Sequence, residues 1–208
     1  CLGALLSYLE DNAHGLLVHI RDLRLYSDQS YVGLDESTLR NLEITQNLHD
    51  RSRRFTLLEV LDHTRCPMGA RRLKRWLLRP LKQIESIVER QELVELFHKN
   101  QILLAKLRDH FAKLYDLERL ASRVALQKAH AKDLLALKSS LATVSALCGL
   151  LESQEPRGPL EALLRNVAGH RVTLDAIAAL LERAILEEPS ILLSEGNLIK
   201  AGYDAELD

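Results

Sequence analysis

The sequence predicts a mainly α protein, a multi-helical core with one long helix and one or two short β pieces. Three observations support this fold class. Hydrophobic residues make up 47% of the 208 residues but aromatic residues only 4%, a balance that suits leucine-rich helices better than a β-sandwich. Apolar residues recur at helical spacing over most of the chain. Strand-like patterns are confined to short stretches, at residues 31–34 and 198–200.

The composition also bears on the class of function. The formal net charge is −1, whereas a domain that holds duplex DNA by itself usually carries a clear positive excess. Cys1, Cys66 and Cys148 are too far apart to suggest a disulfide framework, which favours a reducing, cytoplasmic setting. We therefore expect a cytoplasmic protein in which this chain alone is not a strong DNA binder.

Neither membrane insertion nor secretion is indicated. The unbroken apolar runs are much shorter than the roughly 20 residues of a membrane helix, and residues 1–9 lack the basic start and cleavage site of a signal peptide. The chain begins at Cys1 without a methionine. We expect it to be an excised fragment of a longer protein.

In the first half of the chain, residues 4–10 have a helical pattern, residues 17–25 alternate weakly, and residues 31–34 form a candidate strand. Thr56 and Glu59 have the spacing of a capping box, in which each side chain satisfies a free backbone amide at a helix start. They predict a short helix that reaches residue 62.

A second helix is predicted over residues 69–78, where Gly69, Leu73 and Trp76 share one face. Pro80 should end it, because the residue before a proline is pushed out of the α region. Ser86 and Glu89 suggest another capping box, which would open a helix over residues 84–98.

The remaining helices are predicted over residues 102–114, from Asp116 as N-cap to residue 124, and over residues 132–151. The last of these has a heptad-like seam, which predicts one partner helix along it. A loop at residues 154–159 then precedes two helices, 160–167 and 174–186. The seam residues are Leu134, Leu137, Leu141, Val144, Cys148 and Leu151.

A basic stretch is the most conspicuous candidate for binding. Residues 51–82 contain ten basic residues and only two acids, Glu59 and Asp62. Arg71, Arg75 and Arg79 lie four residues apart and form a candidate contact face. This face either contacts phosphates or pairs with the acidic residues of the next helix, and charge runs more often do the second. Those acidic residues are Glu85, Glu89, Glu92 and Glu95.

No catalytic, cofactor-binding or metal-ligating residue is predicted. None of the nine glycines fits a P-loop, no serine lies in a Gly-x-Ser-x-Gly turn, and the histidines and cysteines lack the spacing of a metal site.

Four blocks together resemble the MutS family of DNA mismatch-repair proteins in order, spacing and residue type. They are LDESTLRNLEI (34–44), TLLEVLDHTRCPMGARRLKRWLLRPL (56–81), YDLERLASRVAL (115–126) and EEPSILLSEGNLIKAGYDAELD (187–208). Nine residues match the two densest family motifs and are expected to have structural roles. They are Met68, Gly69, Leu73, Trp76, Pro80, Asp116, Leu117, Glu118 and Arg119.

The resemblance implies the first half of the family's core (domain III), up to the start of the DNA clamp. It implies one helical unit over residues 1–208, with an alternative division into a core (1–127) and lever helices (128–208). By the resemblance, the fragment itself is not an enzyme and holds no cofactor. The full-length protein would be an ATPase that uses ATP and Mg, binds mismatched duplex DNA, forms a homodimer and meets a MutL-type partner.

The family's mismatch reader contains a Phe-x-Glu motif, which this chain lacks: Phe55, Phe97 and Phe111 are followed two residues later by leucine or lysine. We expect Gly69 to allow close approach of a neighbouring helix, with Leu73 and Trp76 buried. Two other functions stay open from the residues alone. One is a free-standing nucleic-acid-binding module using residues 51–82, and the other is a helical protein-interaction adaptor.

Overall fold

The computed structural model describes residues 2–12, 30–190 and 196–204. The fold is mainly α, as the sequence predicts, and the weakly alternating segment 17–25 lies outside the described residues. The helices are α1 (Leu2–Asn12), α2 (Glu36–Asn41), α3 (Leu57–Leu61), α4 (Pro67–Leu78), α5 (Ile84–Lys99), α6 (Gln101–Ala112), α7 (Leu117–Ala125), α8 (Ala131–Glu152) and α9 (Pro159–Ala184).

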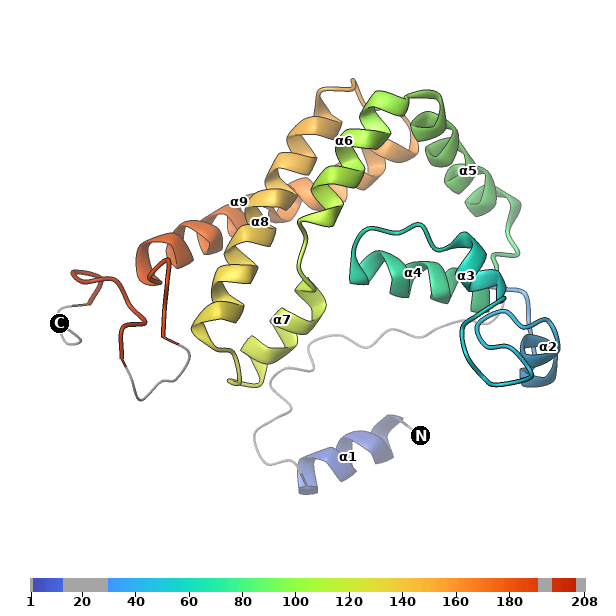
Figure 1. Ribbon diagram of the computed structural model, residues 1–208, viewed down its shortest axis with the longest axis horizontal. Helices are drawn as coiled ribbons and strands as arrows, with labels where there is room; N and C mark the ends of the chain where they lie inside the picture. The colour runs from blue at the N-terminus through green and yellow to red at the C-terminus, as the bar shows by residue number, and fades with distance from the viewer. Residues whose placement is uncertain (1, 13–29, 191–195, 205–208) are drawn as a thin grey trace.

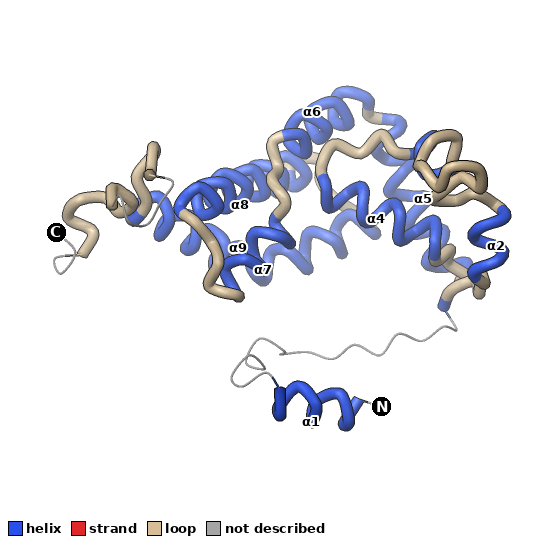
Figure 2. The backbone as a smooth tube through the Cα atoms, turned by 60° about the horizontal axis from the view of Figure 1, so that its bottom comes forward, coloured by secondary structure: helices blue, strands red, loops and turns tan. Residues whose placement is uncertain are grey.

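The two longest helices, α8 and α9, form an antiparallel pair that organises the other elements (Figure 1). Ion pairs join the two helices: Lys138 to Glu182 at 2.8 Å and Arg171 to Glu152 at 2.8 Å. Helices α6 and α7 pack on α8, and α5 packs on the first part of α9. Helix α1 lies apart from the others in both views (Figures 1 and 2).

Two apolar clusters form the core, and α8 contributes to both. Its second half packs through Leu147 and Val144 against Leu103 and Leu107 of α6, and Leu114 joins the same cluster. Its first half packs against the end of α9, where Leu181, Ala184 and Ile185 are buried against Leu134 and Leu137. The predicted partner helix along α8 is α9, which pairs with α8 near both of its ends. The seam is not covered by α9 alone, because its second half also packs on α6.

The sequence predicts two helices after residue 159, and this is also wrong: α9 is continuous from Pro159 to Ala184. Its buried residues lie at the two ends, at Leu160 and Leu164 and again at Leu181 and Ala184. Between the two ends, the same 3-4 spacing continues through half-buried residues: Val167, Arg171, Leu174 and Ala178. Gly169 and the charged Arg171 interrupt the apolar pattern there, so the sequence suggests a break that the backbone does not have.

The local signals at helix starts have mixed outcomes. Thr56 caps α3 by accepting the N–H of Glu59 at 3.1 Å, and the Glu59 carboxylate accepts the N–H of Phe55 at 2.5 Å. The second predicted capping box is wrong, because α5 already begins at Ile84 and Ser86 lies inside its first turn. Helix α4 ends at Leu78, just before Pro80 as predicted.

The β pieces are smaller than expected. Within the described ranges they are two isolated antiparallel bridges, Tyr31 with Leu81 and Ile185 with Ile199. The first ties the segment before α2 to the end of α4, where the Val32 N–H donates to the Pro80 carbonyl at 2.9 Å.

Among the described residues, one helix, α8, has the length and composition to cross a membrane. Its apolar runs are short, because Lys138, Ser139 and Ser140 interrupt them. In the fold α8 has the features of a core helix: Leu141, Leu147 and Cys148 are buried, while Asp133 and Lys138 form ion pairs with neighbouring helices.

Candidate functional site: the junction of α4, α7 and α8

Arg71 joins α4 to the start of α7. Its guanidinium donates to both carboxylate oxygens of Asp116, at 2.7 Å each, in a bidentate pair. It also donates to Glu118 Oε2, through Nε at 2.8 Å and Nη2 at 2.6 Å. One arginine of α4 therefore binds two carboxylates that lie more than 40 residues further along the chain.

The backbone around Asp116 places its carboxylate for this contact. Asp116 is the N-cap of α7, and its Oδ1 accepts the N–H of Arg119 at 3.1 Å. The preceding residue, Tyr115, donates its N–H to the Ser140 hydroxyl of α8 at 3.1 Å. Ser140 is fully buried, so α8 fixes the segment that presents Asp116 to Arg71.

The electrostatics follow from this geometry. Hydrogen bonding to Asp116 and then to Glu118 raises the pKa of Arg71. The Arg71 guanidinium in turn lowers the pKa of the Asp116 carboxyl below its ordinary value. The Arg71 side chain is 44% exposed and that of Glu118 is 65% exposed, so water and salt screen the attraction. The contact therefore fixes the relative position of the helices more than it adds to stability.

The other end of α7 is also tied to α8. Arg123 lies 3.0 Å from the Asp133 carboxylate, and Asp133 accepts the N–H of His130 at 2.9 Å at the start of α8. A second Arg123 nitrogen donates to the Lys128 carbonyl at 3.1 Å. Both ends of α7 are thus connected to α8.

Trp76 forms a second contact of α4. The Arg90 guanidinium of α5 lies 3.7 Å from the Trp76 ring centroid, and that of Arg72 lies 5.5 Å from it, both within cation–π range. Burial, and then repulsion by Arg72, lowers the pKa of Arg90. These residues line a hollow of about 660 Å³ that continues to the first turns of α9.

The predicted contact face does not act as a unit. Arg71 turns to α7, whereas Arg75 and Arg79 lie at the end of α4, where the Arg79 N–H donates to the Arg75 carbonyl. The prediction that the next helix supplies the acidic partners is wrong for Arg71. Helix α5 instead brings Arg90 to α4, and its Glu95 pairs with Lys99 of the same helix.

The nine motif residues lie on the elements that meet at this junction. Met68 packs against the cluster of α6 and α8, while Leu73 and Trp76 are half-buried rather than fully buried. The nearest atoms to a Cβ built on Gly69 are in Cys66 and Thr64, so the glycine faces the turn that precedes α4 and not a neighbouring helix. The sequence did not lead to a prediction for Ser140. Its only signal was a hydroxyl side chain among the apolar residues of a predicted helix.

The arrangement holds helices together through hydrogen bonds and ion pairs. Within residues 2–12, 30–190 and 196–204, no group of three or more His, Cys, Asp or Glu side chains is placed to bind a metal. The fold and the junction together define a helical structural unit, in which charged and hydroxyl side chains fix the positions of packed helices.

Comparison with known proteins identifies the family. A family profile described as MutS domain III matches residues 37–208. The DNA mismatch repair protein MutS of Treponema pallidum is 40% identical over 206 residues, covering 99% of this chain and 22% of that protein. The proteins of the same name from Symbiobacterium thermophilum and Methanosarcina barkeri are 43% and 39% identical, with 99% of this chain and 23% of each protein covered.

The chain belongs to the MutS domain III family, as the sequence motifs predict. It spans less than a quarter of the length of these three curated relatives.

Proposed function

We propose that this chain is the structural core of a DNA mismatch-repair protein. In this proposal it couples mismatched-DNA binding and clamp closure to an ATPase elsewhere in the same polypeptide, and it catalyses no reaction itself. ATP and Mg would be bound outside this chain. The full-length protein would be cytoplasmic, act as a homodimer and bind mismatched duplex DNA and a MutL-type partner.

The observation that carries the proposal is the Arg71 junction. A continuous series of contacts runs from α4 through Arg71 to Asp116, then through Tyr115 to Ser140 of α8. Helix α8 has 22 residues, a length of about 33 Å at 1.5 Å per residue. Rigid helices joined by a few specific polar contacts can carry a movement between distant sites when those contacts have two arrangements.

The two alternative functions have less support. A nucleic-acid module that uses residues 51–82 would need Arg71, which is committed to Asp116 and Glu118. An adaptor that binds a helix along the α8 seam would need that seam open, and α6 and α9 cover it.

The test uses Arg71→Gln in the full-length protein. It measures DNA binding, ATP hydrolysis and the effect of each ligand on the other activity. Affinity for mismatched DNA without nucleotide and ATP hydrolysis without DNA should stay within about 2-fold of wild type, because neither site contains Arg71. The effect of ATP on DNA release, and of mismatched DNA on ATP hydrolysis, should fall by about 5-fold or more, within the usual range of coupling energies.

The matched control is Arg165→Gln, which removes an arginine from an exposed pair with Glu161 inside α9 and should leave the coupling unchanged. The coupling role is refuted if Arg71→Gln preserves both effects of one ligand on the other. It is also refuted if the control reduces them equally.

A further inference from the structure

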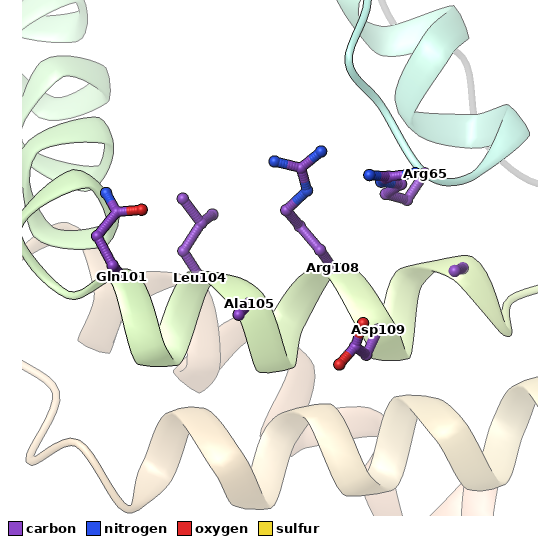
Figure 3. Close-up of a pocket in the computed structure, with 7 residues that line it drawn as sticks. Arg65, Gln101, Leu104, Ala105, Arg108 and Asp109 are labelled. Atoms are coloured by element: carbon purple, nitrogen blue, oxygen red, sulfur yellow. The ribbon is translucent and has the colours of Figure 1, made fainter.

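A second pair of arginines lies outside the Arg71 junction. Arg65, in the turn before α4, and Arg108 of α6 line a hollow of about 360 Å³. Figure 3 shows the Arg108 side chain rising from α6 toward the turn before α4, with the Arg65 side chain beside it. Gln101 and Leu104 project to the same side of α6 as Arg108, and Asp109 also lines the hollow, with its carboxylate directed away from the two guanidinium groups in Figure 3.

These arginines differ from Arg71 in having no acidic partner. In the part of the chain that the structure describes, no carboxylate pairs with Arg65 or Arg108, whereas Arg71, six residues after Arg65, binds two. Two unpaired cations that line one hollow repel one another unless an anion lies between them. With Asp109 included, the lining keeps a net positive charge, which suits an anion.

The chemistry of the pair indicates which anion. Each guanidinium offers a planar fork of N–H donors that matches an oxyanion in a bidentate manner. One fork is enough for the two oxygens of a carboxylate, as Arg71 and Asp116 show. Two forks that converge from separate elements suit a phosphate, which presents its oxygens in several directions.

The surroundings favour one phosphate of a long strand over a small phosphorylated molecule. Ala105 and Ala112, one turn before and one turn after Arg108, also line the hollow and are exposed. Because these side chains are small, they leave room along α6 for an extended nucleic-acid backbone to pass the two arginines.

We propose that Arg65 and Arg108 bind a backbone phosphate of duplex DNA without reading its sequence. This site is separate from the Arg71 junction, and it rests on the proposed function only in requiring that the full-length protein binds duplex DNA. The contact supplies affinity that depends on salt and does not discriminate between bases.

The experiment measures binding of the full-length protein to a fully paired duplex over a series of chloride concentrations. The joint variant Arg65→Gln with Arg108→Gln should lower the slope of log affinity against log salt by about 1, the value for one neutralised phosphate. The variant Arg65→Lys with Arg108→Lys keeps both charges and should keep the wild-type slope. The charge-matched control, Arg157→Gln with Arg183→Gln, removes one arginine from the loop before α9 and one from the last turn of α9. It should also keep the wild-type slope.

An unchanged slope in the glutamine variant overturns the proposal, as does an equal decrease in the control or in the lysine variant. Titration with inorganic phosphate, followed by ³¹P line broadening, separates the sources. If phosphate binding depends on both arginines but the DNA slope does not, the site serves another phosphorylated ligand and the proposal is wrong. If the wild-type protein binds no duplex at all, the proposed function fails as well, so the two failures are distinguishable.

Discussion

Gly69 has a different environment from the one that the family motif suggested. A Cβ built there would lie 3.4 Å from both the Cys66 sulfur and the Thr64 Cβ, which is ordinary van der Waals contact. The residue also lies inside α4, where glycine is less favourable than alanine by about 1 kcal/mol. The glycine is therefore not required for close packing within the described residues.

We expect Gly69→Ala to raise the free energy of unfolding by up to about 1 kcal/mol, because it restricts the unfolded chain without a clash in the folded one. Urea denaturation of the chain measures this change. Gly149→Ala in α8, where an added Cβ meets nothing within 4 Å, is the matched control and should give a similar gain. If Gly69→Ala lowers the free energy of unfolding while Gly149→Ala raises it, α4 does require glycine at residue 69.

At the scale of the elements, α8 fixes the positions of α6, α7 and α9, because all three pack against it. Its hydroxyl at Ser140 is fully buried and accepts the Tyr115 N–H at 3.1 Å. An alanine there would leave a partly buried backbone donor without its acceptor, and such a loss costs about 1 to 3 kcal/mol. The same hydrogen bond holds the backbone that leads into α7.

We therefore expect Ser140→Ala to lower the free energy of unfolding by about 1 to 3 kcal/mol and to loosen the α7 start. Urea denaturation gives the first quantity, and amide hydrogen exchange at Tyr115 and Arg119 gives the second. Ser139→Ala, an exposed position on the same helix, should change stability by less than about 0.5 kcal/mol. Equal effects of the two substitutions would show that the buried hydroxyl has no special role.

The elements also show how far the sequence could predict the structure. Helices with local signals were predicted well: Asp116 caps α7, Pro80 follows the end of α4, and α8 spans residues 131–152 against a prediction of 132–151. The continuity of α9 was not predicted, because Gly169 and Arg171 interrupt its apolar spacing although the backbone stays helical. The partner of Arg71 could not be predicted either, because a contact across 45 residues depends on how α5 and α6, which separate the two residues in the chain, pack in the fold.

At the scale of the whole molecule, carboxylates bound at helix starts and turns link stability to pH. Hydrogen bonds lower the pKa values of Asp35, Asp50, Asp62 and Asp116 below their ordinary value of 3.8. These residues cap or bridge the segments that lead into α2, α3, α4 and α7. Because their folded-state pKa values are depressed, the stability they contribute is present above the unfolded-state pKa and is lost as the pH falls through the folded-state pKa.

Asp116 offers the clearest test of this link, since Asn is as good an N-cap as Asp and removes only the charge. We expect the difference in stability between wild type and Asp116→Asn to be constant from pH 7 to about 5 and to shrink below about pH 4. There the unfolded-state carboxyl takes up a proton that the folded-state carboxyl, with its lowered pKa, does not yet bind. Thermal denaturation over this pH range, at low salt, measures it. In an Arg71→Gln background most of the pH-dependent difference should disappear, because the guanidinium is the largest cause of the lowered Asp116 pKa. If the pH dependence is the same in both backgrounds, the ion pair between α4 and α7 does not hold the carboxylate in its charged form, and the junction loses its electrostatic basis.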